Sequence, residues 1–256
     1  MSTNQSACVL VIGNEILSGR TQDSNIQMLA TGLSEIGVIV REARVIPDDR
    51  ALIISTVNTV RSRFDIVFTT GGIGPTHDDI TAECISEAFG VPLEENATAV
   101  TLLRNYYGSD SLSEARLRMA RIPQGAELLE NPVSQAPGFR LENVYVLAGV
   151  PRIAAASFEL IKNRFKGGTL IISRALSASI RESDLARSLA RIQNDFSDIE
   201  IGSYPFMSDD GTYGVSVVVR GPVEERLNDA LAEVARSVRE LGCEPSFLDH
   251  AEVRAQ

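Results

Sequence analysis

Three apolar runs near the N-terminus constrain the fold more than any other feature of this sequence. They are CVLVIG at 8–13, VIVREARVI at 38–46 and DIVFTT at 65–70. Each run is followed by a polar loop and then by an amphipathic stretch with helical spacing. Strands buried on both faces are typically continuous apolar runs, and their parallel pairing requires crossover connections. This order predicts an α/β fold in which helices cover both faces of a parallel sheet.

The stretch 47–64 shows the helical spacing most clearly. We expect its inward face to be formed by Leu52, Ile53, Val57 and Val60. Because this helix would connect the second and third strands, its length and spacing support the crossover arrangement.

The second half of the chain follows a different pattern. Strands are expected over 169–180, 199–207 and 213–221, with helices over 182–196 and 223–242. The β-α-β-β-α order is typical of a small α+β domain. We therefore expect two domains, residues 1–166 and residues 167–256 with the C-terminal tail, joined at Lys166-Gly167-Gly168.

The composition excludes several classes of partner. With 34 acidic against 24 basic residues, the formal net charge is −10, which disfavours binding to nucleic acid or to an anionic membrane. The three cysteines form no CxxC pair, and an odd number argues against a disulfide framework. There is no basic leader and no long apolar run, so we expect a cytoplasmic protein without membrane attachment.

Acidic residues follow all three predicted strands. Ligands of open parallel sheets bind at the carboxyl ends of the strands, so the three loops should meet in one site. The acids in these loops are Glu15, Asp23, Asp48, Asp49, Asp78 and Asp79.

The loop TTGGIGPTHDD at 69–79 combines glycines with two aspartates. Glycines let backbone N–H groups approach a phosphate, and the following helix start favours an anion. Aspartates would repel that phosphate unless a divalent cation lies between them, so the combination indicates a metal-assisted phosphate site. The alternative is structural: an aspartate is a good helix N-cap, and glycines form turns.

The same segments resemble a known family. GNEILSGRTQDSN, VIPDD and TTGGIGPTHDDIT look like the molybdopterin-binding domain of the MoaB/Mog type. NPVSQAPGF and LAGVP resemble the version found in the competence/damage-inducible protein A (CinA) family. The resemblance covers roughly residues 8–165, and residues 169–245 resemble the small domain that follows in that family.

The resemblance implies a homo-oligomer, a dimer or trimer, with a pterin- or nucleotide-binding cleft. It implies that Asp48 and Asp79 are the functional acids, both catalytic and holding a divalent ion, Mg²⁺ or Mn²⁺. It implies molybdopterin or a nucleotide as the small-molecule ligand. The ligand-binding positions that it implies, together with neighbouring loop residues, are Gly13, Glu15, Gly19, Asn25, Thr70, Gly71, Gly72, Gly74, Pro75, Thr76 and Asp78.

Two functions remain open. CinA-like members are associated with metal-dependent cleavage of dinucleotide pyrophosphates such as ADP-ribose, and eukaryotic relatives with FAD. The alternative is a molybdopterin or nucleotide binder without turnover, linked to molybdenum cofactor biosynthesis. Ile153 stands where relatives commonly have an acid, which favours binding over reaction. Longer members carry a C-terminal amidase domain, and we expect no deamidase activity from this chain.

Overall fold

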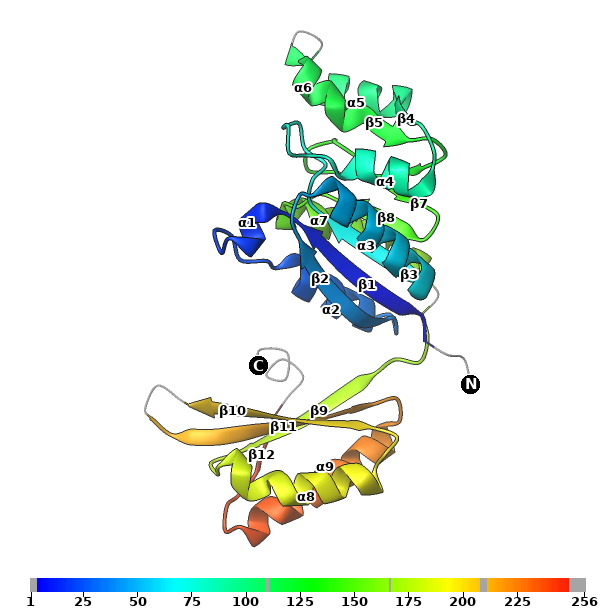
Figure 1. The fold of residues 1–256 in the computed structure, drawn as a ribbon. Helices are drawn as coiled ribbons and strands as arrows, with labels where there is room; N and C mark the ends of the chain where they lie inside the picture. Colours follow the sequence, from blue (N-terminus) through cyan, green and yellow to red (C-terminus); the bar gives the residue numbers. More distant parts are fainter. Residues whose placement is uncertain (1–3, 109–110, 166, 208–210, 249–256) are drawn as a thin grey trace. The chain divides into compact units, whose positions relative to one another are not determined.

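The chain forms two compact units, Met1–Thr169 and Leu170–Gln256 (Figure 1). The computed structural model describes residues 4–108, 111–165, 167–207 and 211–248. The boundary lies three residues beyond the predicted one. Gly168 N–H donates to Gly37 O at 3.2 Å, and Asn4 Nδ2 donates to Thr169 O at 2.9 Å, so these residues are bonded to the first unit. Lys166 lies outside the described residues.

The first unit is built on a six-stranded sheet with the order β2-β1-β3-β8-β7-β6. The strands are β1 (Ser6–Ile12), β2 (Ile39–Ile46), β3 (Ile66–Thr70), β6 (Glu127–Leu129), β7 (Gly138–Leu141) and β8 (Val144–Leu147). β2, β1, β3 and β8 are parallel, as the apolar runs predict. β7 runs antiparallel to both of its neighbours, β8 and β6, so the sheet is mostly rather than wholly parallel.

Helices cover both faces of this sheet (Figure 1). α3 (Arg50–Arg63) and α4 (Thr81–Phe89) pack on one face, and α2 (Asn25–Ser34) and α7 (Pro151–Ile161) on the other. The side chains of β1 alternate between the two cores: Cys8, Leu10 and Ile12 face α3, and Ala7, Val9 and Val11 face α2. The predicted α/β class is therefore confirmed.

The inward face of α3 differs at one position from the prediction. Ile53, Val57 and Val60 are fully buried, but Leu52 is 41% exposed. Thr56 takes its place in the buried stripe, because the positions 53, 56, 57 and 60 follow the helical spacing.

A small lobe follows α4 in the chain. It contains β4 (Leu93–Glu95) paired with β5 (Arg121–Pro123), and α5 (Ala97–Tyr107), α6 (Glu114–Leu117) and the 3₁₀ turn η2 (Arg118–Ala120). Asn96 caps α5 by accepting hydrogen bonds from the N–H groups of Thr98 and Ala99 at 3.0 Å. A second 3₁₀ turn, η3 (Lys162–Arg164), follows α7.

The second unit is an antiparallel sheet with two helices. Its strand order is β10-β11-β9-β12. The elements are β9 (Ile172–Ala178), α8 (Glu182–Asp195), β10 (Glu200–Met207), β11 (Tyr213–Gly221), α9 (Glu224–Glu240) and β12 (Ser246–Leu248). Five of them agree with the α+β prediction. β12 was not predicted, because three residues are too short for a recognisable period.

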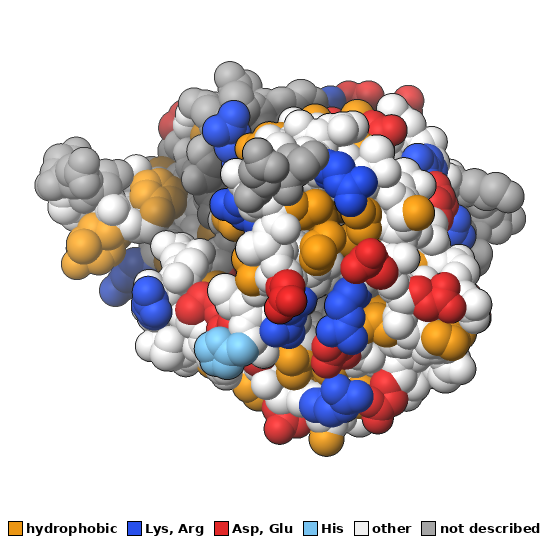
Figure 2. Space-filling model, turned by 90° about the horizontal axis from the view of Figure 1, so that it is seen from above, with side chains coloured by type: hydrophobic (Ala, Val, Ile, Leu, Met, Phe, Trp, Pro, Cys, Tyr) orange, Lys and Arg blue, Asp and Glu red, His pale blue; other side chains and the backbone are white. Residues whose placement is uncertain are grey.

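The surface carries charges of both signs. In Figure 2, acidic and basic side chains are intermixed over the face shown, with apolar side chains between them. Among the described residues, no helix has the length and hydropathy needed to cross a membrane.

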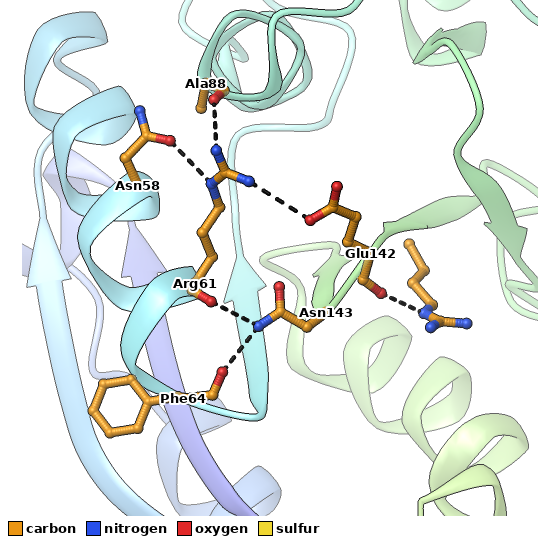
Figure 3. Close-up of polar contacts among 7 residues, drawn as sticks. Asn58, Arg61, Phe64, Ala88, Glu142 and Asn143 are labelled. Atoms are coloured by element: carbon orange, nitrogen blue, oxygen red, sulfur yellow. Dashed lines mark hydrogen bonds and ion pairs between the residues drawn. The ribbon is translucent and has the colours of Figure 1, made fainter.

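Arg61 joins three elements at the edge where β3 and β8 begin (Figure 3). Its guanidinium donates to Asn58 Oδ1 at 3.0 Å and to Ala88 O at 3.2 Å, and lies 3.6 Å from Glu142 Oε2. Asn143 Nδ2 donates back to the carbonyl oxygens at the end of α3, including Arg61 O at 2.9 Å. These bonds fix the β7–β8 hairpin against α3 and α4.

Candidate functional site

The carboxyl ends of β1 and β3 form the switch point of the sheet. From β1 the chain moves to β2 on one side, and from β2 it returns to β3 on the other side of β1. The crossover helices α2 and α3 therefore lie on opposite faces, and the loops after β1 and β3 diverge. Open α/β sheets bind ligands in the crevice that such a divergence leaves.

The loop after β3 requires glycine at two successive positions. Gly71 and Gly72 have φ angles of 103° and 66°, a region that other residues rarely adopt. A Cβ at Gly71 would lie 2.1 Å from Ile12 O, and one at Gly72 would lie 2.2 Å from Thr81 Oγ1. The glycines thus allow this loop to pass close to the end of β1 and to the start of α4.

The same loop presents free hydrogen-bond donors. The N–H groups of Gly72, Ile73 and Gly74 have no acceptor among the described residues. α4 begins nearby, and its N-cap, Ile80, has no capping side chain. Backbone N–H groups of this kind suit an anionic oxygen.

Asp48 follows β2 and is tied to the loop after β1. One oxygen of its half-buried carboxylate accepts a hydrogen bond of 2.9 Å from Asn14 N–H, in the short helix α1 (Asn14–Leu17). Burial raises the pKa of the Asp48 carboxyl, the charges of Glu15 and Asp78 add to this rise, and the bond from Asn14 opposes it. No described Lys or Arg forms an ion pair with Asp48.

Two of the six predicted acids have a structural role. Asp49 is the N-cap of α3 and accepts from Leu52 N–H at 2.8 Å. Asp23 accepts from Ile26 N–H at 2.9 Å, at the start of α2. For these two residues the capping alternative accounts for the acid.

Asp78 and Asp79 do not cap α4. Asp79 Oδ2 accepts from the N–H of Thr76 at 2.8 Å and from its hydroxyl at 2.7 Å, which closes the loop on itself. Asp78 is exposed, and its charge acts on Asp48. Thr76 Oγ1 also donates to Asp78 Oδ1, so both aspartates are bonded within the loop. In the described part of the chain, no group of three or more His, Cys, Asp or Glu side chains is arranged to hold a metal.

A pocket of about 50 Å³ opens beside these loops, between the ends of β1 and β3 and the loop before α7. Asn25 and Gly149 both line it, and Asn25 Nδ2 donates to Gly149 O at 2.9 Å. Asn25 Oδ1 and Thr70 Oγ1 are both buried and have no partner among the described residues. Side chains and backbone of Glu15, Thr21, Asp23, Asn25, Thr70 and Gly149 contribute to its wall.

The remaining predicted residues are placed as follows. Gly13 N–H donates to Ile46 O at 3.1 Å, and a Cβ there would lie 2.6 Å from the Glu15 carboxylate. Gly19 forms the turn after α1 with a φ of 71° and does not line the pocket. Pro75 is exposed on the loop after β3.

Sequence reasoning missed Asn14 and assigned no role to Gly149. Both act through backbone atoms, which leave no residue-type signal, although Gly149 lies within LAGVP. Ile153 lies in the first turn of α7, where its N–H donates to Val150 O at 2.9 Å.

The fold and the crevice at its switch point define an α/β protein of the class that binds small ligands at the carboxyl edge of the sheet. Comparison with known proteins specifies the family. Residues 8–166 match the model described as Probable molybdopterin binding domain, and residues 170–245 match the middle domain of FAD synthase. The chain belongs to the molybdopterin-binding-domain family of the MoaB/Mog type and is a CinA-like member of it.

Individual relatives agree with this assignment. A protein of Aeropyrum pernix is 32% identical over 259 residues, which cover 94% of this chain and 97% of that protein. A CinA-like protein of Myxococcus xanthus is 40% identical over 157 residues, 59% of this chain and 37% of that protein. The crystal structure of the protein CinA from Thermoplasma acidophilum superposes with a TM-score of 0.60 at 34% identity, covering 64% of this chain and 99% of that one.

Proposed function

We propose that this site hydrolyses the pyrophosphate bond of a dinucleotide of the ADP-ribose or FAD type, with a divalent ion such as Mg²⁺ or Mn²⁺. The observation that carries the proposal is the pairing of two features across the crevice. One is the carboxylate of Asp48, with which no Lys or Arg of the described residues forms an ion pair. The other is the row of free N–H groups from Gly72 to Gly74.

The residues present fit a divalent ion. Asp48 is half-buried, and the charges of Glu15 and Asp78 act on it, so a bound cation would stabilise its ionised form. A cluster of three carboxylates is not required, since Mg²⁺ is usually held by one or two carboxylates together with substrate phosphates. Asp48, with Asp78 or Asp79 from the loop after β3, would hold the ion. When bound, such an ion neutralises phosphate charge and makes bound water more acidic.

The protein's own groups would supply the rest of the catalysis. The N–H groups of Gly72, Ile73 and Gly74, which have no acceptor among the described residues, would bind phosphoryl oxygens on which charge develops. Asn14 N–H fixes the orientation of the Asp48 carboxylate, and Thr76 fixes that of Asp79. The acids are thus held in place before a ligand arrives, which lowers the cost of ordering them.

The match of residues 170–245 to a domain of FAD synthase supports a dinucleotide as ligand. A second function, binding of molybdopterin or a nucleotide without turnover, is favoured by the family description and by Ile153 in place of an acid.

Incubation with ADP-ribose or FAD separates the two functions. With Mg²⁺ or Mn²⁺, the hydrolase releases two monophosphates over hours, measured by chromatography, and chelation of the metal abolishes their release. Ligand-dependent stabilisation in a thermal-shift assay, without products above a chelated control, would instead establish the binding protein.

A further inference from the structure

Arg50 is the first residue of α3 and lies two positions after Asp48. Its guanidinium is held by two acids of α4: it forms a close ion pair with Glu87 and lies 3.6 Å from Glu83 Oε2. Glu83 Oε1 also accepts a hydrogen bond of 2.8 Å from Arg121 Nη1, in β5. These contacts join the start of α3 to α4 and, through α4, to the small lobe.

The stability of α3 does not explain an arginine at its first position. The N-terminal end of a helix carries a partial positive charge, which favours acidic side chains there and disfavours basic ones. Arg63, the last residue of α3, stands where the helix dipole favours a basic side chain. Because Arg50 stands at the unfavourable end and pairs with two acids of α4, its contribution is to the contact between the two helices.

Both helices that Arg50 joins carry parts of the site. α3 begins directly after the loop that holds Asp48. α4 is bonded to the loop after β3, because Thr81 N–H donates to Gly72 O at 2.9 Å and Thr81 Oγ1 donates to Gly71 O at 3.0 Å. The distance between the Asp48 carboxylate and the N–H groups of this loop therefore depends on how the starts of α3 and α4 are held together.

Arg50 does not neutralise the acids of the crevice. Both of its ion-pair partners lie on α4. After burial, the charges that raise the pKa of the Asp48 carboxyl are those of Glu15 and Asp78. The bond from Asn14 N–H to Asp48 joins the loops after β1 and β2. The ion pairs of Arg50 add the connection from the loop after β2 to the loop after β3.

We propose that Arg50 is a positioning residue, which holds the Asp48 carboxylate at the distance from the loop after β3 at which one ion and the ligand phosphates bind to both. The inference rests on the proposed function for the ion and the phosphates. Arg50 acts through Asp48 and this loop, and it does not touch the ligand.

The other end of α3 provides a matched control. The side chains of Arg50 and Arg63 are 55% and 54% exposed, and Arg63 also pairs with a glutamate of a neighbouring element, Glu42 of β2, at 3.3 Å. Arg63 lies three residues before β3, at the edge where this strand begins. Because exposed ion pairs contribute little to stability, R50A and R63A should each lower the melting temperature by no more than about 4 °C.

The test combines calorimetric titration with ADP and Mg²⁺ with amide exchange at Asn14, measured by NMR in the ligand-free protein. R50A should bind ADP about 10-fold more weakly than the wild type. The Asn14 amide, which is bonded to the Asp48 carboxylate, should exchange at least about threefold faster in R50A. R63A should match the wild type in both measurements.

A double variant separates positioning from direct contact with the ligand. Glu83→Ala/Glu87→Ala keeps the charge of Arg50 but removes both of its partners. Positioning predicts that this variant loses affinity as R50A does. An arginine that bound phosphate directly would instead bind it equally well or better once it was released from the glutamates.

Unchanged affinity in R50A, an equal loss in R63A, or undiminished affinity in the double variant would each overturn the positioning role. If the wild type binds no ADP with Mg²⁺, the proposed function fails, and amide exchange at Asn14 decides the positioning role. A faster rate in R50A alone then supports this role, and equal rates in the wild type and R50A overturn it. Arg50-dependent binding without release of AMP from ADP-ribose refutes only the hydrolysis.

Discussion

The Asp48 carboxylate accepts a hydrogen bond from Asn14 N–H at 2.9 Å, which joins the loops after β2 and β1. The bond holds an uncompensated negative charge beside Glu15, within electrostatic reach of Asp78 on the third loop. Three loops that are distant in sequence thus contribute acids to one crevice. The adjacent Asp49 caps α3 instead, which makes the two aspartates a natural comparison.

Replacing Asp48 with Asn should weaken metal-dependent binding of ADP without loss of the fold. The amide oxygen can still accept from Asn14, but one of the charges that would hold the ion is gone. Calorimetry with ADP and Mg²⁺ should show at least about a 10-fold weaker affinity. Asp49→Asn should bind as the wild type, because Asn is also a good N-cap. Unchanged affinity in Asp48→Asn would mean that no ion is held there.

Titration of the Asp48 carboxyl should also make the free energy of unfolding depend on pH. Its pKa in the folded protein is raised above the ordinary 3.8, so its contribution to stability is present below that value and is lost as the pH rises through the folded pKa. Asn at this position cannot titrate. The free energy of unfolding of the wild type, relative to Asp48→Asn, should therefore fall in EDTA as the pH rises above the ordinary pKa of 3.8. Denaturant titrations that give parallel pH profiles for the two proteins would refute the raised pKa.

Gly71→Ala should be far more damaging than a comparable glycine substitution elsewhere. Both Gly71 and Gly90 have positive φ, but only Gly71 would bring its Cβ to 2.1 Å from Ile12 O, since Gly90 has open space around it. We expect a loss of about 1 kcal/mol for Gly90→Ala and at least about twice that for Gly71→Ala. Equal losses in urea unfolding would show that the close contact with β1 does not constrain the loop.

Arg61→Ala should lower stability and leave ligand affinity unchanged. Arg61 bonds α3 to α4 and to the β7–β8 hairpin, at the edge of the sheet opposite the site (Figure 3). Its removal should cost about 1–3 kcal/mol, because the carbonyl of the buried Ala88 loses its partner and the bonds to Asn58 and Glu142 are lost as well. Arg104→Ala, at an exposed position on α5, is the control and should cost little. Weakened ADP binding by a still-folded Arg61→Ala protein would show that this edge of the sheet affects the site at the opposite edge, and would contradict the prediction.

Much of this architecture follows from the sequence alone. Continuous apolar runs identify β1, β2 and β3, and their alternation with helices fixes parallel pairing and the edge where ligands bind. The antiparallel pairing of β7 with β6 and β8 did not follow from the sequence, because strands of three or four residues carry no pattern that shows their direction. Leu52 was assigned to the core because hydrophobicity alone does not show that Thr56 completes the buried stripe.

The position of the site could be predicted from the sequence, but the role of each of its acids could not. Spacing showed that acids gather after the strands, yet it could not separate the capping Asp49 and Asp23 from Asp48. Nor could it show that Asp78 and Asp79 both accept hydrogen bonds from Thr76 of the same loop. These distinctions depend on side-chain orientation and on backbone donors, which residue types do not encode.

Release of AMP from ADP-ribose by wild type, Asp48→Asn and Asp49→Asn is the most direct test of the proposed hydrolase. The three proteins differ by one oxygen-to-nitrogen replacement: Asp48 is the proposed ligand of the ion, whereas Asp49 caps α3. With Mg²⁺ or Mn²⁺, the wild type and Asp49→Asn should release AMP at similar rates, and Asp48→Asn should be slower by about 100-fold or more. Equal rates in all three proteins, or no AMP from the wild type with either metal, would contradict the account.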